Sequence, residues 1–408
     1  MKNKLIILFV LFSLTSFSQS ISSSPYSLYG LGSVYESNFG AIAGAGSTGI
    51  ATTSNKFLNN LNPASLAFMI KNHFLFEVGG SLIGSTYEDN STKESRNNVQ
   101  FSHIAFGFPV TAKSAFSVAL LPYSSSSFKI SNLKLDIEDS NESYTLNATG
   151  SGGLNKFDLS YGYMLSKKWA LGLTASFLFG NTTDNRDYIV LNSVTSIDKS
   201  TSYGGVRPSL GTQFVADSTM TFGMNIKSPA KINASKDESV SIYNNSGTTT
   251  ISSDELSDVD DYYMPLEIGV GFNKSFKDLT FSVDYEKSLW ANTNQSELYG
   301  NYVNQDKYAF GVSYKNKKSS RNYWDNIQYS AGVKYDKGYL EVDGKRVNNA
   351  LFSLGVSLPI NDVFSAINIG YSYGQQGRIT DGLIKENYHK VSVNLSLDGI
   401  WFVKRKID

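Results

Sequence analysis

The chain of 408 residues contains no cysteine and only eight prolines. Without cysteine there is no disulfide framework, no thiolate metal site and no lipoprotein anchor. Lys plus Arg and Asp plus Glu number 36 each, so no net charge favours a nucleic-acid or strongly acidic partner. These absences exclude small disulfide-stapled domains and basic nucleic-acid-binding proteins.

Long apolar runs are missing beyond the first residues. Lys2 and Lys4 precede an apolar stretch from Leu5 to Leu14, followed by small polar residues. This order is typical of a secretory signal peptide, which we place at residues 1–20. Its apolar core is shorter than the roughly 20 residues of a membrane-spanning helix. No later run approaches that length, so we expect an exported protein without helical membrane spans.

Aromatic residues, in contrast, are abundant at 13% of the chain. From His73 onward, short segments alternate aromatic or β-branched residues with Gly and Ser, as in Phe74, Phe76 and Val78. Tyr and Trp gather near the ends of these segments, as amphipathic rings do at membrane interfaces. We therefore predict that residues 73–398 form an all-β, antiparallel, up-and-down transmembrane barrel.

The connections between these segments alternate in length. Seven long and six short connections link about fourteen strands, the asymmetry of an outer-membrane barrel with periplasmic turns and external loops. A soluble sandwich or propeller is the weaker alternative, since there is no repeat of 40–50 residues. The short connections lie near 111–114, 166–168, 216–218, 275–278, 316–323 and 359–362, and the long loops at 85–98, 124–155, 181–200, 228–261, 292–305, 337–348 and 375–387.

A Gly- and Ala-rich stretch at residues 39–70 precedes the first strand. We interpret residues 21–72 as an extension and a hatch that plugs the barrel lumen. Gly44, Gly46 and Gly49 match G-x-G-x-x-G, but no strand–helix context for a nucleotide is present, so they serve close backbone packing. Asn62, Pro63 and Ala64 are the expected latch of this hatch, and a gate if it opens.

Pro122 falls inside the third expected strand. Proline cannot donate to a sheet ladder, so it either opens the wall sideways or marks the start of a loop. Both interpretations remain open from the sequence.

Candidates for chemistry are few. His73, His103 and His389 are scattered and more consistent with wall or rim positions than with a triad or a zinc site. The acidic run at residues 254–261 lacks the spacing of a calcium loop and reads as a surface loop. The basic end at residues 399–408 is expected to be a periplasmic tail. We expect no catalytic site, no metal and no cofactor.

Three stretches carry a family resemblance: Leu61–Phe68 (LNPASLAF), Phe222–Ile232, and Met264–Trp290 with Asp284 and Trp290. With these motifs the chain resembles the FadL family of outer-membrane channels, in the version found in Bacteroidota. The resemblance implies a fourteen-stranded barrel in the outer membrane of a Gram-negative bacterium, an N-terminal hatch, and lateral release of a hydrophobic molecule at a kink in the third strand.

Two functions follow. The first is passive uptake of small, fatty-acid-like hydrophobic molecules, with hatch displacement and lateral release near Pro122. The second is a plugged scaffold that binds partner proteins of an outer-membrane secretion or assembly complex. An enzyme ranks third.

Overall fold

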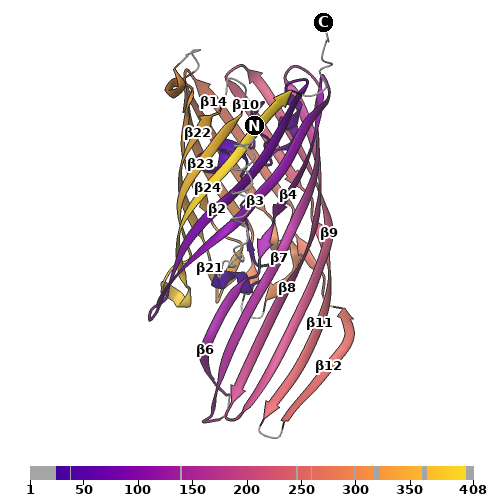
Figure 1. The fold of residues 1–408 in the computed structure, drawn as a ribbon, viewed down its shortest axis with the longest axis vertical. Coiled ribbons are helices and arrows are strands. Elements are labelled where there is room, and N and C mark those ends of the chain that lie inside the picture. Colours follow the sequence, from indigo (N-terminus) through magenta and orange to yellow (C-terminus); the bar gives the residue numbers. More distant parts are fainter. Residues whose placement is uncertain are drawn as a thin grey trace, which may run out of the picture.

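The computed structural model describes residues 24–36, 38–137, 140–244, 247–258, 260–297, 300–316, 322–360 and 365–400. They form one closed antiparallel barrel of 14 wall strands, as the sequence predicts (Figure 1). β2 pairs with β24 along its whole length and closes the wall. The wall strands are β2 (His73–Glu88), β3 (Lys93–Thr111), β4 (Ser114–Pro122), β7 (Ser143–Met164), β8 (Trp169–Val190), β9 (Ser193–Asp217), β10 (Met220–Lys227), β14 (Glu267–Phe276), β15 (Leu279–Ser288), β18 (Gln305–Lys315), β19 (Gln328–Asp336), β22 (Asn349–Pro359), β23 (Ala366–Gln376) and β24 (Lys385–Ile400).

Side-chain alternation gives the wall two chemically different faces. Outward positions carry large apolar side chains such as Leu173 and Val206, which are 58% and 51% exposed. Inward positions carry buried polar side chains, among them Glu77, Gln213 and Asn394. An apolar outer band with a polar interior is the pattern of an outer-membrane barrel.

One group of strands runs far past the others. β8 and β9 span 22 and 25 residues, against the 9–11 that cross a bilayer. β6 (Phe128–Asp136), β11 (Ala230–Asn244) and β12 (Gly247–Asp258) extend the same sheet, in the order β6-β7-β8-β9-β11-β12. These strands form the projection at the foot of Figure 1.

The predicted long loops are corrected in two places: 85–98 is largely the ends of β2 and β3, and 124–155, 181–200 and 228–261 are largely strands of the projection. Ser, Thr, Asn and Asp occupy both faces there, so the sequence shows no apolar alternation. Backbone pairing continues because each strand keeps a neighbour, and the turns are only a few residues long. The acidic run is likewise part of β12 up to Asp258, and Asp261 pairs with Lys231 at 2.6 Å.

The remaining long connections contain short elements. β13 (Tyr262–Met264) pairs with β11, whereas β16 (Ser296–Glu297), β17 (Gly300–Tyr302), β20 (Leu340–Val342) and β21 (Lys345–Arg346) form a small sheet. Single 3-10 turns lie at η5 (Trp290–Thr293), η6 (Tyr323–Asn326) and η7 (Thr380–Gly382). No helix in the described ranges is long and apolar enough to cross a membrane.

The predicted signal peptide at 1–20 lies outside the described residues. The predicted tail at 399–408 does too, except for Gly399 and Ile400, which are the last residues of β24. β24 ends at Ile400, two residues past the predicted boundary.

Candidate functional site: the luminal segment and its wall contacts

Residues 24–70, called here the luminal segment, run inside the barrel. They contain η2 (Pro25–Leu28), β1 (Ser33–Val34), η3 (Gly40–Gly44) and η4 (Pro63–Phe68). The segment touches inward-facing residues of strands on all sides, including β3, β9, β15 and β22. Its indigo ribbon is visible between the walls in Figure 1.

Asn62 and Pro63 begin η4. The Asn62 Oδ1 atom accepts a hydrogen bond from the Ala64 N–H at 3.1 Å, and Pro63 takes the first helical position, where no N–H is needed. The Asn62 amide donates to the carbonyls of Ile50 at 2.8 Å and Thr212 at 3.1 Å. Asn62 is fully buried, so one side chain caps a turn and ties it to wall strand β9.

Asp284 of β15 holds the middle of the segment. Its Oδ2 atom accepts from the Gly49 and Ile50 N–H groups at 2.6 and 3.0 Å. A hydrogen bond to a charged group contributes about 1.5–3 kcal/mol, and more is lost if the donors are left unpaired. Asp284 therefore fastens a loop that would otherwise bury unsatisfied donors.

Other wall side chains repeat this pattern around the barrel. Each one bonds a backbone group of the luminal segment, so the contact does not depend on the segment's side chains. The bonds are Glu77 to the Leu58 N–H at 3.2 Å, Gln213 to the Ile50 carbonyl at 3.0 Å, Asn225 to the Leu61 carbonyl at 2.7 Å, Asn394 to the Gly40 carbonyl at 3.2 Å, and Ser353 to the Gly46 N–H at 2.8 Å.

Glycines line the wall where the segment passes closest, and we call them the glycine belt. A Cβ on Gly223 would lie 2.1 Å from the Ile50 carbonyl oxygen, and one on Gly332 would lie 2.3 Å from the Gly46 nitrogen. Wall and segment are thus in backbone-to-backbone contact that any side chain would prevent. The belt comprises Gly107, Gly162, Gly172, Gly211, Gly223, Gly271, Gly311, Gly332, Gly355 and Gly370, each on a different strand.

The apolar space at the outer end of the lumen is filled by the segment itself. Tyr26 is buried in an aromatic cluster with Trp290 and Tyr302. Leu31 is buried against Leu154 of β7 and Ile232 of β11. An apolar ligand would have to displace these side chains to reach the same surfaces.

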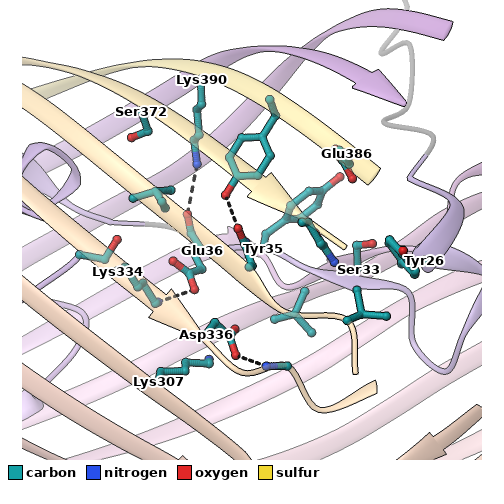
Figure 2. Close-up of a pocket in the computed structure, with 18 of the residues that line it drawn as sticks. Tyr26, Ser33, Tyr35, Glu36, Lys307, Lys334, Asp336, Ser372, Glu386 and Lys390 are labelled. Atoms are coloured by element: carbon teal, nitrogen blue, oxygen red, sulfur yellow. Dashed lines mark hydrogen bonds and ion pairs between the residues drawn. The ribbon is translucent and has the colours of Figure 1, made fainter. Parts of the chain in front are cut away.

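A cavity of about 260 Å³ remains between the segment and strands β18, β19 and β24. Charged groups project into it, as Figure 2 shows. Lys334 donates to the Glu36 carboxylate at 2.5 Å, and Lys390 donates to the Glu36 carbonyl at 3.3 Å. Lys307 and Asp336 face the same space. The lining is mixed, because apolar and aromatic side chains such as Trp290, Leu340 and Leu351 lie beside these charged groups.

Pro122 is the last residue of β4 and pairs with Asn155 of β7. The β3–β4 ladder stops just before it, at Ile104 and Leu120. The chain then turns into the lumen as β5 (Ser124–Ser125), which pairs with β1, before β6 resumes beside β7. Among the described strands, no pairing joins residues 93–103 of β3 to β6.

The structure brings the predicted hatch residues to the wall. Gly44 lies against Gly355, Gly46 against Gly332, and Gly49 on Asp284, while Pro63 and Ala64 lie against Gly172. Their role as a gate, and that of Pro122 as a lateral opening, remain predictions. The glycine belt itself was missed, although its signal is in the sequence as Gly and Ser at inward positions of successive strands.

The histidines do not assemble. His73 contacts Asp398, His103 stacks on Phe39, and His389 contacts Tyr371. In the described part of the chain, no group of three or more His, Asp or Glu is arranged to hold a metal ion.

Solved structures with the same fold include toluene transporters and a FadL homologue. The toluene transporter TodX of Pseudomonas putida has a TM-score of 0.65 at 13% identity, over 90% of this chain and 100% of its own. The toluene transporter TbuX of Ralstonia pickettii gives 0.62 at 14%, over 88% and 98%. A FadL homologue of Pseudomonas aeruginosa gives 0.60 at 11%, over 90% and 99%.

The fold therefore defines an outer-membrane β-barrel of the FadL type, as the sequence motifs indicated. No curated protein matches the chain. The family model described as BamG matches residues 1–408, so the chain belongs to the BamG family.

Proposed function

We propose that this protein is a plugged barrel that acts as a scaffold subunit, binding partner proteins of an outer-membrane secretion or assembly complex. One observation carries the proposal: wall strands on all sides of the lumen hold the luminal segment in place. Polar side chains and belt glycines of most strands contact its backbone, and its own Tyr26 and Leu31 fill the apolar space. A gate that opens in each transport cycle would have to break many buried hydrogen bonds together.

The test is purification of the tagged, full-length protein from its native outer membrane in mild detergent. We expect a partner protein in a fixed ratio that persists through size exclusion. An isolated monomer, with lipid-like density in its lumen, would contradict the scaffold.

A second candidate is passive uptake of a small hydrophobic molecule, with displacement of the luminal segment and lateral release near Pro122. The interrupted ladder between β3 and β6 favours it, because it leaves a stretch of wall without strand pairing. Proteins of known structure with this fold include toluene transporters, which supports uptake of a hydrophobic molecule as the second candidate.

Replacing Pro122 with Ala tests this route. Alanine restores a backbone donor, so β4 can continue along β3 and narrow the interruption. We expect slower uptake of a radiolabelled fatty acid or toluene by whole cells. Uptake that is unchanged in the variant, together with no binding to the purified barrel, excludes the channel.

A further inference from the structure

The outer half of β3 has a neighbouring strand on one side only. Residues 75–88 of β2 pair with β3 along one of its edges. On the other edge β4 accompanies it only between Ile104 and Thr111, and no described strand pairs with residues 93–103 there. We call this side of residues 93–103 the open edge. Such an edge presents backbone donors and acceptors with which a further strand can pair.

The hairpin between β2 and β3 shows which backbone groups lie on the open edge. At its turn the Asp89 N–H donates to the Thr92 carbonyl at 3.1 Å. Hydrogen-bonded pairs alternate along an antiparallel ladder, and the register between the two strands is unbroken as far as Phe101. The even-numbered residues 94–100 therefore bond to β2, whereas odd-numbered residues such as Val99 direct their N–H and C=O groups to the open edge.

Val99 lies at the height of the lipid-facing band. Its side chain points outward and is 62% exposed, and its row continues through Leu82 of β2 and Val391 of β24, which are also exposed. Phe101 is 41% exposed on the same face. Lipid offers no hydrogen bonds, and no described residue pairs with the Val99 backbone on the open edge. These groups therefore call for a polypeptide strand beside them.

The inward side of the same stretch has an unmet polar group as well. Gln100 lines the cavity of about 260 Å³, and its Oε1 atom is buried and accepts no hydrogen bond from the described residues. A strand along the open edge would place alternate side chains beside Val99 and beside Gln100. The complementary strand thus has apolar side chains on its lipid face and a hydrogen-bond donor on its inward face.

The β3 strand of a second copy fits this edge poorly. β3 runs from the outer side toward the periplasmic turn at residues 112–113. Two copies inserted the same way round in one membrane present their β3 edges in the same direction, so these edges could pair only in parallel, the less stable arrangement. An antiparallel neighbour runs outward from the periplasmic side and therefore comes from a different strand.

We propose that the open edge binds an extended, amphipathic strand of another outer-membrane protein, which pairs antiparallel with residues 93–101 of β3. This inference rests on the scaffold proposal and names the contact that holds the partner. Recognition runs through the backbone of β3, so it depends on the N–H groups of the open edge more than on its side chains.

The first experiment places a photo-crosslinking amino acid at 99, at 101 or at 391 of the full-length protein in intact cells. Position 391 lies in the same outward row as 99, on a strand that is paired on both sides. We expect one protein to be cross-linked from 99 and 101 about tenfold more strongly than from 391. The cross-linked residues should lie in one segment, and their numbers should fall as the β3 position rises, because the strands are antiparallel.

Four outcomes of this experiment overturn the proposal. They are cross-links to lipid alone or none at all, cross-links to a second copy of this chain, equal cross-linking from 391, and partner residues whose numbers rise with the β3 position.

A pair of substitutions separates backbone pairing from side-chain contact. Val99→Pro removes the N–H group at the open edge without removing a bond to β2, so we expect a folded barrel and a loss of about tenfold in recovery of the partner. Val99→Ala truncates the same side chain but keeps the N–H group, so recovery should fall by no more than about twofold. Equal losses in the two variants, or no loss in Val99→Pro, contradict pairing at this edge. Heat-modifiable mobility in gels reports folding; if Val99→Pro does not fold, the cross-linking positions decide.

The two failures are distinguishable. If the unmodified protein has no partner, the scaffold function fails. If a partner is retained by Val99→Pro and is not cross-linked from 99 or 101, the scaffold stands and the open edge is not its contact.

Discussion

At the scale of single residues, Asp284 shows how the wall holds the luminal segment. It accepts two buried backbone hydrogen bonds, from Gly49 and Ile50, with one carboxylate oxygen. The sequence marked Asp284 through its place in a family-like motif, yet could not connect it to Gly49, 235 positions away. Asn62 was easier to predict, since Asn followed by Pro is a local capping signal.

We expect Asp284→Ala to lower the free energy of unfolding by roughly 3 kcal/mol, because two buried donors lose their acceptor. Urea titration of the purified barrel in detergent measures this. Trypsin cleavage at Lys56 should also accelerate as the segment loosens.

Asp284→Asn is the control, because it keeps an acceptor oxygen at the same place and should lose about half as much or less. An Asp284→Ala protein with an unchanged midpoint and unchanged proteolysis would show that the bond to Gly49 is dispensable.

At the scale of elements, period-two alternation was enough to predict the wall strands and their closure. The projection escaped prediction because a strand that is polar on both faces has no periodic signal. The glycine belt escaped prediction for another reason. It becomes visible only when the strand registers are known, since these place Gly172 beside Gly211 and Gly311 beside Gly332 on neighbouring strands.

The belt makes a sharp prediction. Gly223→Ala would put a Cβ 2.1 Å from the Ile50 carbonyl oxygen, so wall or segment must shift, at a cost of about 1–3 kcal/mol. We expect a lower thermal midpoint in heat-modifiability gels and less protein in the outer membrane.

Gly204→Ala is the matched control, on the outward face of β9, where nothing lies within 4 Å of the new atom. It should be neutral or slightly stabilising. Equal effects of the two substitutions would mean that strand propensity, not the fit to the segment, sets the requirement for glycine.

At the scale of the whole molecule, fold and membrane location followed from the sequence, whereas the choice between scaffold and channel depends on whether the segment moves. Because the chain has no cysteine, an engineered disulfide that fixes the luminal segment to the wall would have no competing thiol. Leu58 Cγ lies 3.4 Å from the position of a Gly107 Cβ, within reach of a disulfide between Leu58→Cys and Gly107→Cys.

With the segment locked, we expect partner binding to be unchanged, because the lock changes no surface outside the lumen. Hydrophobic uptake, if the barrel performs it, should stop on oxidation and return with a reductant. A locked protein that loses its partner would contradict a static role for the segment. The single-cysteine variants are the controls for the substitutions themselves.

The glycine belt also has a consequence for how the molecule is made. A wall shaped so closely to the luminal segment cannot be completed empty and filled afterwards. Glycines of ten strands and polar side chains of others contact residues 24–70, which are covered at the outer end by Trp290 and Tyr302. We expect β2 and β24 to pair last, after residues 24–70 have already bound to the inner face of the open sheet. The luminal segment then acts as the template on which the barrel's circumference is set.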